Sequence, residues 1–264
     1  MSAKRIRLLG RCWSIVLLSC CLISQVASAT TIVIIRTHNM VVIASDSKAQ
    51  YQGDQGSPQV CKIAKQNETY FVVAGLVHDT YHGFLANRTV ASAIARGTTF
   101  EEQANAVAVD LQRELEKELS VLRTDDPDGF KFAVTGDVPS SIALVAVEGG
   151  VPKVVVFSFV IDKASGKLTV VRDSCPGSCP GEDFIVQMGR AFSSQEVAKV
   201  TGPPTRIART LVEMQIGKDP QNVGPPIEVL ELRAAGPEWI QDDLNCAAET
   251  NTRKKYPHSV IVNF

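Results

Sequence analysis

The sequence lacks a strong net charge of either sign. Its 264 residues carry 27 Lys and Arg against 28 Asp and Glu, which gives a formal charge of −1. Binding to nucleic acid or to anionic lipid relies on clustered positive charge, so neither is expected as a partner. Internal repeats and low-complexity segments are also lacking, and 45% of the residues are apolar. This composition is typical of one globular domain with a sizeable core.

The chain also has little that favours a membrane span. Its candidate apolar run, residues 14–26, is short, follows four Lys and Arg residues, and precedes the small residues Ala27-Ser28-Ala29. This order predicts a secretory signal peptide over residues 1–29, cleaved between Ala29 and Thr30, and no stable membrane anchor. The mature chain is then secreted or periplasmic, and its formal charge is −5, because the signal takes four basic and no acidic residues. An alternative is lipoprotein processing at residues 17–20, Leu-Leu-Ser-Cys, with lipidation of the cysteine.

Cysteine is scarce in the predicted mature chain, and no His/Cys spacing suits zinc. Cys61, Cys175, Cys179 and Cys246 remain after signal removal. Export favours disulfides, and four cysteines allow three pairings. One of these closes the Cys175–Cys179 loop on itself and joins Cys61 to Cys246; the other two stay open.

Hydrophobic periodicity predicts an α+β fold in which strands alternate with two pairs of helices. Most predicted strands are joined by short turns, which favours antiparallel sheets, and the element order fits two stacked sheets with helical layers outside. Capping boxes at Thr99/Glu102 and Ser193/Glu196 mark two helix starts. Strands are predicted over 31–36, 40–45, 70–74, 130–135, 141–148, 151–161, 167–172, 184–188 and 227–233, and helices over 76–96, from about 100 to 122, 195–200 and 205–216.

The segments TTIVIIR at residues 30–36 and VVIASDSKA at residues 41–49 resemble the start of β-type proteasome subunits. They are similar as well to the start of the peptidase subunit of the bacterial two-component ATP-dependent protease. Members of this family carry a terminal Thr, an Asp 16 residues later and a Lys 32 residues later, and these offsets from Thr30 fall on Asp46 and Lys62. The resemblance implies the N-terminal-nucleophile hydrolase fold, a four-layer αββα sandwich, over residues 30–233. Residues 234–264 form an extension without an assigned role.

Amide hydrolysis by a terminal threonine explains why Thr, Asp and Lys are the residue types at these positions. A threonine hydroxyl becomes a nucleophile once a base takes its proton, and a free α-amine with a pKa of about 7.7–8.0 is a base on the same residue. By resemblance, Lys62 favours the developing negative oxygen, Asp46 holds the ammonium in place, and the N–H of Gly75 is the oxyanion donor. Ala74-Gly75 is expected to open a helix.

Two further positions are compared with the family. Asp219, followed by Asn222 and Gly224, resembles a late Asp-x-x-Ser-Gly segment that supports the terminal amine, although Asn replaces Ser. Gly189-Arg190-Ala191 stands where the family usually has Gly-Ser-Gly, which argues for a less efficient enzyme. The simpler interpretations are a helix-ending Asp-Pro turn at Asp219 and a strand end with positive φ at Gly75.

The resulting hypothesis is an exported threonine-type peptidase that acts on peptides or unfolded proteins through an acyl-enzyme and assembles as a homo-oligomer. Two alternatives remain: a small-amide amidohydrolase with the same nucleophile, and a catalytically inactive binding or structural protein. No cofactor is expected. His78 and His82, four residues apart on a predicted helix with Asp79 between them, are interpreted as structural, because a metal site needs a third ligand.

The predicted cleavage site ends one bond before the predicted nucleophile, so signal removal itself would expose the active amine. We therefore expect N-terminal sequencing of the exported protein to begin at Thr30. A mature chain that begins at any other residue contradicts this prediction.

Overall fold

The structure is a computed structural model that describes residues 30–49, 58–79, 82–162, 167–178, 183–189 and 191–248, together with the backbone of residues 260–263. The predicted signal peptide, Cys179 and Arg190 lie outside the described residues.

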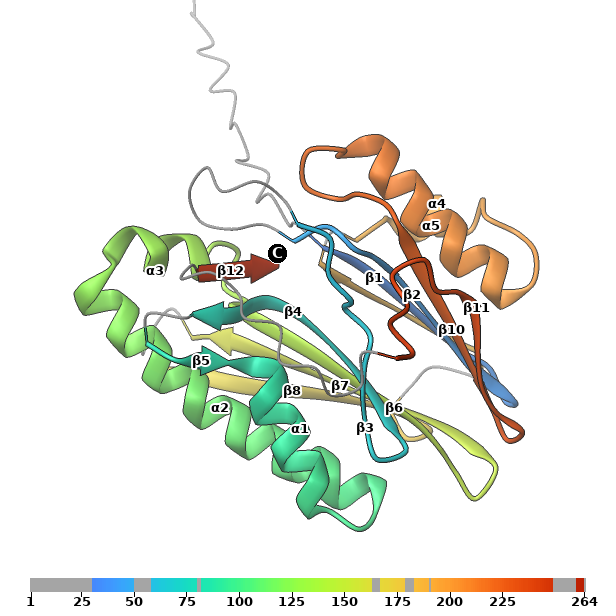
Figure 1. Ribbon diagram of the computed structural model, residues 1–264, viewed down its shortest axis with the longest axis horizontal. Coiled ribbons are helices and arrows are strands. Elements are labelled where there is room, and N and C mark those ends of the chain that lie inside the picture. The colour runs from blue at the N-terminus through green and yellow to red at the C-terminus, as the bar shows by residue number, and fades with distance from the viewer. Residues whose placement is uncertain are drawn as a thin grey trace, which may run out of the picture.

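The described part of the chain is mixed α+β, with five helices and two antiparallel sheets (Figure 1). The strands are β1 (Thr31–Arg36), β2 (Met40–Asp46), β3 (Ala64–Gln66), β4 (Thr69–Asp79), β5 (Phe84–Leu85), β6 (Ser140–Glu148), β7 (Val151–Ile161), β8 (Leu168–Cys175), β9 (Phe184–Gly189), β10 (Ile227–Arg233), β11 (Gly236–Gln241) and β12 (Val260–Asn263). The helices are α1 (Ala86–Arg96), α2 (Phe100–Asp125), α3 (Pro127–Ala133), α4 (Ser194–Val197) and α5 (Pro204–Lys218).

The five-stranded sheet has the order β11-β10-β2-β1-β9, and the seven-stranded sheet is built around β12-β4-β6-β7-β8, with β3 and β5 also paired to β4. β1 and β2 form the predicted hairpin at the centre of the first sheet. The chain returns to this sheet twice, when β9 pairs with β1 and when β10 pairs with β2. The first hairpin is therefore enclosed by strands from the second half of the chain.

The nearly continuous apolar runs of β1 and β2 follow from burial on both faces of their sheet. Ile32 and Ile34 pack into a cluster that includes Val72 of β4, so this face meets the second sheet. Val33, between them, packs into another cluster with Leu211 of α5. Because successive strand residues point to opposite faces, a strand covered on both sides needs apolar residues throughout.

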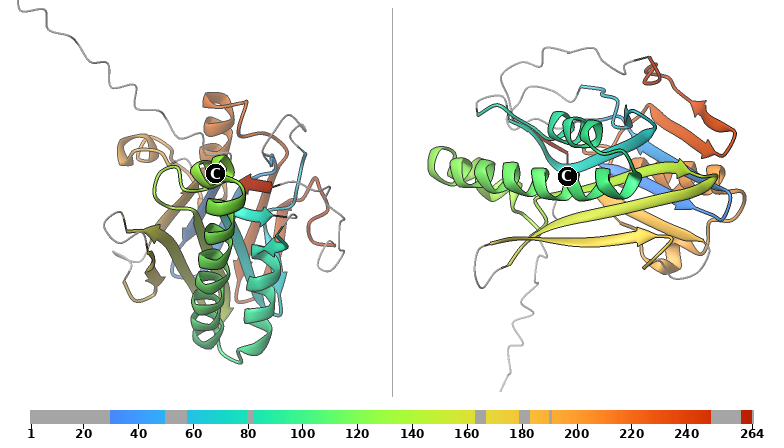
Figure 2. Two further views of the ribbon diagram at one scale, coloured as in Figure 1. Left: turned by 90° about the vertical axis from the view of Figure 1, so that its left-hand side faces the viewer. Right: turned by 90° about the horizontal axis from the view of Figure 1, so that it is seen from below.

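The helices cover the outer faces of the sheets. The stripe on α2 that was predicted from spacings of three and four is buried with residues of α1, β4 and β6. Figure 2 shows α1 and α2 side by side along the seven-stranded sheet, with α5 on the other sheet. The capping boxes Thr99/Glu102 and Ser193/Glu196 are confirmed at the starts of α2 and α4.

The helix predicted over residues 76–96 is wrong in its first half. β4 continues without a break through Asp79, and α1 begins only at Ala86. Every residue of β4 is buried, and the strand pairs with β6 on one side and β12 near its end. Sheet pairing thus overrides the helix-like spacing of Val77, Phe84 and Leu85, and Gly75 lies within a strand instead of opening a helix.

The strand predicted over residues 130–135 is also wrong, because α3 covers Pro127–Ala133. The alternation of Phe130 and Phe132 favoured a strand. Asp126 caps the helix by accepting a hydrogen bond from the Gly129 N–H, and proline at the first helical position suits a helix start. The helix predicted over residues 195–200 is shorter than expected, since α4 ends at Val197.

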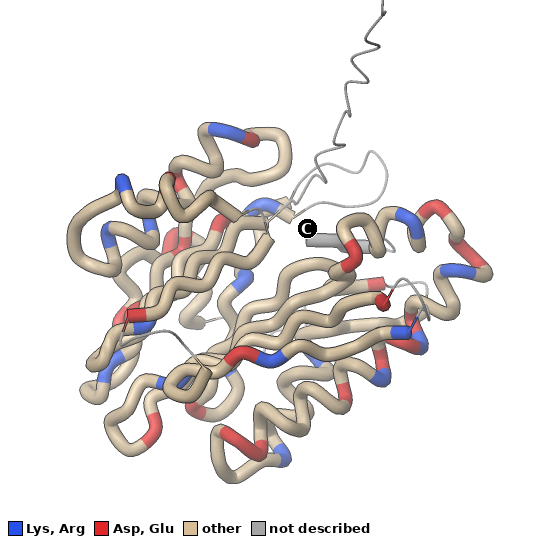
Figure 3. The backbone as a smooth tube through the Cα atoms, turned by 180° about the vertical axis from the view of Figure 1, so that it is seen from behind, with Lys and Arg blue, Asp and Glu red and all other residues tan. Residues whose placement is uncertain are grey.

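Charged residues of both signs are interspersed along the helices and turns, while the central strands are nearly free of them (Figure 3). None of the helices in the described residues is long and apolar enough to cross a membrane. Among the described residues, the buried charged side chains include Asp46, Lys62, Asp79 and Glu118.

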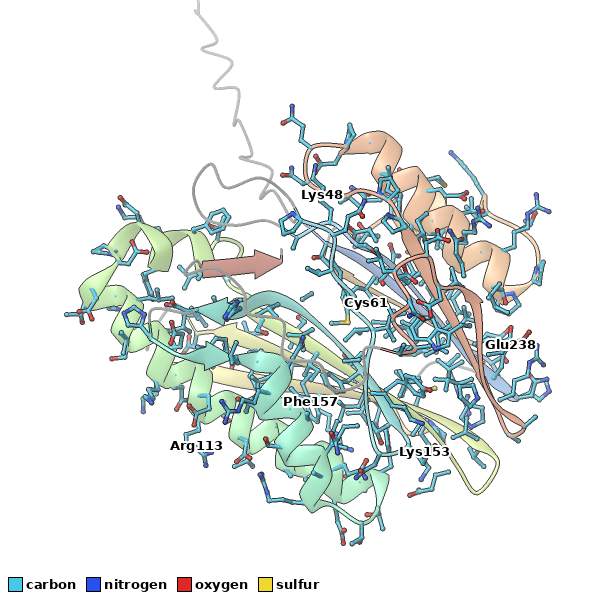
Figure 4. The ribbon with its side chains drawn as sticks, viewed as in Figure 1. Lys48, Cys61, Arg113, Lys153, Phe157 and Glu238 are labelled. Carbon is cyan, nitrogen blue, oxygen red and sulfur yellow. A yellow bond between two sulfur atoms is a disulfide. The ribbon has the colours of Figure 1, made fainter. Side chains whose placement is uncertain are left out.

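A disulfide joins Cys61 to Cys246 across a sequence separation of 185 residues. Figure 4 shows it between the segment that leads into β3 and the loop after β11. This confirms the Cys61–Cys246 bond of the pairing that also closes the loop at Cys175. Cys175 is disulfide-bonded as well, whereas Cys179 lies outside the described residues.

We expect the double substitution Cys61→Ala/Cys246→Ala to lower the free energy of unfolding by about 3–5 kcal/mol, because the bond closes a long loop and limits the unfolded chain. Urea unfolding followed by circular dichroism measures the change. Equal urea midpoints for the variant and the oxidised parent would show that the disulfide adds no stability.

Candidate active site

Three of the predicted residues meet in one buried cluster. The Lys62 Nζ donates a hydrogen bond to the Thr30 Oγ1 at 3.1 Å and another to the Asp46 Oδ1 at 2.7 Å. Thr30 and Asp46 are fully buried, and the Lys62 side chain is 1% exposed. The lysine amine thus connects a threonine hydroxyl to a carboxylate away from solvent.

The hairpin explains why an offset of 16 residues brings Thr30 and Asp46 together. β1 and β2 are antiparallel with Ile32 opposite Ser45, so the start of β1 lies beside the end of β2. The backbone N–H of Thr31 donates to the Asp46 Oδ1 at 2.9 Å, which fixes the carboxylate against β1. Lys62 enters from the segment before β3, next to the disulfide at Cys61.

Asp46 accepts hydrogen bonds on both oxygens. Lys62 and the Thr31 N–H occupy Oδ1. The backbone N–H groups of Lys48 and Gly224 donate to Oδ2 at 3.1 and 3.3 Å. Sequence reasoning did not identify these two backbone donors. Because four donors hold one buried carboxylate, its position is fixed by the folded chain itself.

Burial and the ion pair act on Lys62 in opposite directions. Desolvation lowers the pKa of Lys62 below its ordinary value of 10.5, while the charge of Asp46 and the hydrogen bond to it raise the pKa. Desolvation is the larger effect, so the net shift is downward. Lowering the pKa of a buried lysine brings its proton exchange closer to neutral pH.

Gly75 lies on β4, in the sheet that packs against β1 and β2. Ala74, the residue before it, packs in the same layer between the sheets as Ile32. Gly75 has φ +94°, and a Cβ atom there would stand 2.3 Å from the Pro139 carbonyl oxygen. Both the backbone conformation and the close approach of Pro139 require glycine at this position.

Asp219 connects to the cluster through the loop that follows α5. It ends that helix and accepts hydrogen bonds from the Asn222 amide at 2.9 and 3.1 Å. Two residues later, Gly224 donates to Asp46 and accepts from the Ser47 N–H. The Lys48 amine, labelled in Figure 4, donates to the Pro220 carbonyl. Asn222 therefore holds Asp219 in a loop whose other end supports the Asp46 carboxylate.

Gly189 lies opposite Thr31 in the pairing of β9 with β1, and its φ is +80°. This places the Gly189-Arg190-Ala191 departure beside the start of β1. Arg190 itself lies outside the described residues, so the role of its side chain stays a prediction.

A second group of titratable residues lies where the end of β4 meets α2. The His82 Nδ1 is 2.6 Å from the Asp79 Oδ2 and 3.6 Å from the Glu118 Oε1. Burial, together with a hydrogen bond to Asp79 and its charge, raises the pKa of Glu118 to about 8. The predicted helical pairing of His78 with His82 is wrong, because His78 belongs to β4 and His82 to the turn after it.

Comparison with known proteins adds no family assignment: the sequence matches no protein-family model and no curated protein at a significant level.

We expect Asp46→Asn to lower the free energy of unfolding by about 3–5 kcal/mol, because it leaves the Lys62 ammonium buried without its carboxylate. The double variant Asp46→Asn/Lys62→Met should recover much of this loss. Urea unfolding is the measurement, and Glu213→Gln, which breaks the exposed pair with Arg209, is the control, with an expected change of about 0.5 kcal/mol or less. If Asp46→Asn lowers the free energy of unfolding by no more than Glu213→Gln does, the buried ion pair between Lys62 and Asp46 is contradicted.

Proposed function

We propose that the protein is an N-terminal-nucleophile hydrolase that cleaves amide bonds with the hydroxyl of Thr30. The observation that carries the proposal is the position of the Lys62 Nζ, within hydrogen-bond distance of both the Thr30 Oγ1 and the Asp46 Oδ1. A buried lysine, carboxylate and threonine in contact favour a polarised hydroxyl over a purely structural ion pair. An ion pair between Lys62 and Asp46 with a purely structural role would not need a hydrogen bond from Lys62 to Thr30.

The reaction begins with the chain cut before Thr30. The free α-amine takes the hydroxyl proton, and the Thr30 Oγ attacks the substrate carbonyl carbon to form a tetrahedral intermediate. The proton passes to the leaving amine as the C–N bond breaks, which leaves an ester on Thr30. Water then attacks the ester, and the acid product and the threonine hydroxyl are released. The amine must be neutral to act as a base, so the rate is expected to rise with pH through a pKa of about 7.7–8.0.

Lys62 and Gly75 provide the electrostatic part of the mechanism. The ammonium of Lys62 stabilises the negative charge that develops on the Thr30 oxygen, and Asp46 keeps that ammonium in position. The N–H of Gly75 is assigned to the oxyanion of the intermediate, which suits the requirement for glycine in this part of β4. Asp219 is assigned to the support of the terminal amine, through the loop that contains Gly224.

The packing supports the finer fold assignment, a four-layer αββα sandwich. One hydrophobic cluster lies between the two sheets, and one lies between each sheet and its helices. This arrangement is the one implied by the resemblance to β-type proteasome subunits. We accordingly propose peptides or unfolded proteins as substrates, export by the predicted signal peptide, and assembly into a homo-oligomer.

Replacement of the nucleophile tests the proposal. With exported, processed protein, Thr30→Ala should lower the rate of hydrolysis by about 10,000-fold or more, whereas Thr30→Ser should keep a measurable rate. Fluorogenic peptides and small amides assayed in parallel distinguish a peptidase from an amidohydrolase. Mass spectrometry after treatment with an inhibitor that reacts with terminal threonines should locate one adduct on Thr30.

Thr37→Ala, in the turn between β1 and β2, is the matched control and should leave the rate unchanged. If the parent protein cleaves neither substrate class and takes up no inhibitor, the inactive binding protein is the correct alternative. Activity that survives Thr30→Ala would show that another residue is the nucleophile.

A further inference from the structure

The cluster at the end of β4 has the composition of a transition-metal site. Asp79, His82 and Glu118 each offer one ligand atom, and these three atoms lie within 4.8 Å of one another. Asp79 is fully buried and Glu118 is 4% exposed. Ligand atoms around a tetrahedral zinc ion lie about 3.3–3.5 Å apart, given bonds of about 2.0–2.2 Å. Small side-chain rotations therefore bring the three atoms to that spacing.

An independent observation points to a ligand. The Glu118 Oε1 is buried, faces the imidazole of His82 at 3.6 Å and accepts no hydrogen bond from an N–H or O–H donor, although the Glu118 carboxyl group contacts that of Asp79. A buried carboxylate oxygen without a partner is costly, and such groups are normally satisfied by a donor or a metal ion.

We propose that Asp79, His82 and Glu118 bind one Zn²⁺ ion, with water at the fourth position. One nitrogen and two carboxylate oxygens suit zinc better than calcium or magnesium, which prefer six or more ligands that are all oxygen. The Asp125 Oδ2 lies 3.8 Å from the His82 Nε2, on the side of the ring away from the proposed ion. At this distance the carboxylate acts on the imidazole through its charge and makes no hydrogen bond to it.

The ion would join two elements, β4 and α2, that also share the hydrophobic core. Asp79 ends β4, His82 follows in the turn, and Glu118 and Asp125 lie in the second half of α2. Binding therefore clamps the end of β4 onto α2, four residues beyond Gly75. The proposal stands on these residues alone and does not depend on the hydrolase function.

A second group of potential ligands does not support metal binding. Glu228, Asp242 and Cys246 also lie close together. The Cys246 sulfur is bonded to Cys61, however, so it is not available as a thiolate.

Zinc titration of the full processed protein, stripped with a chelator and followed by calorimetry, tests the site. We expect one Zn²⁺ per chain and a rise in melting temperature of about 5 °C at a hundredfold excess over the dissociation constant. Cobalt substitution should give the visible absorption of a low-symmetry site, and magnesium or calcium should give no shift.

His82→Ala and Glu118→Gln should each weaken zinc binding at least about 100-fold. Glu116→Gln, the same change at an exposed position of α2, should bind zinc as the parent does. Circular dichroism checks that the variants are folded, and Glu118→Gln keeps the side-chain shape if His82→Ala does not fold. The proposal is overturned if the parent binds no stoichiometric zinc, or if folded Glu118→Gln binds it with unchanged affinity, since the ion would then lie elsewhere.

Discussion

The buried ion pair between Lys62 and Asp46 is the constraint on which the site depends. Removing two charges from water is costly, and the cost is tolerated only when each charge has close partners. Asp46 gains these partners from β1, from the chain after β2 and from Gly224 of a distant loop. The ion pair thus requires that the hairpin, the segment before β3 and the loop after α5 come together, and in doing so it fixes the hydroxyl of Thr30.

Much of this arrangement could be predicted because it is local or periodic. The hairpin follows from two apolar runs with a polar turn, and its register accounts for the offset between Thr30 and Asp46. The stripe on α2 and the two capping boxes are short-range patterns, so they were predicted correctly. The offset to Lys62 was recognised only through a resemblance, since nothing in the segment itself indicates where the lysine lies in space.

The errors occurred where long-range pairing decides the structure. The end of β4 carries a helix-like spacing, and only β6 and β12 on its sides keep it extended. That error also hid the cluster at Asp79, because Glu118 is far from His82 in sequence. The backbone donors at Lys48 and Gly224 carry no side-chain signal. Phe130 and Phe132 alternate as strand residues do, although the cap at Asp126 sets the helix.

The strand order has a consequence for a chain made from its N-terminus. Thr30, Asp46 and Lys62 belong to the part of the domain that is synthesised first. The partners of this part are synthesised much later: β1 pairs with β9, β2 pairs with β10, and Cys61 is bonded to Cys246. A nascent or truncated chain therefore contains all three polar residues without the neighbours that bury them. We therefore expect the buried cluster to be complete only when synthesis is nearly finished, so that the three residues are present well before the arrangement that buries them.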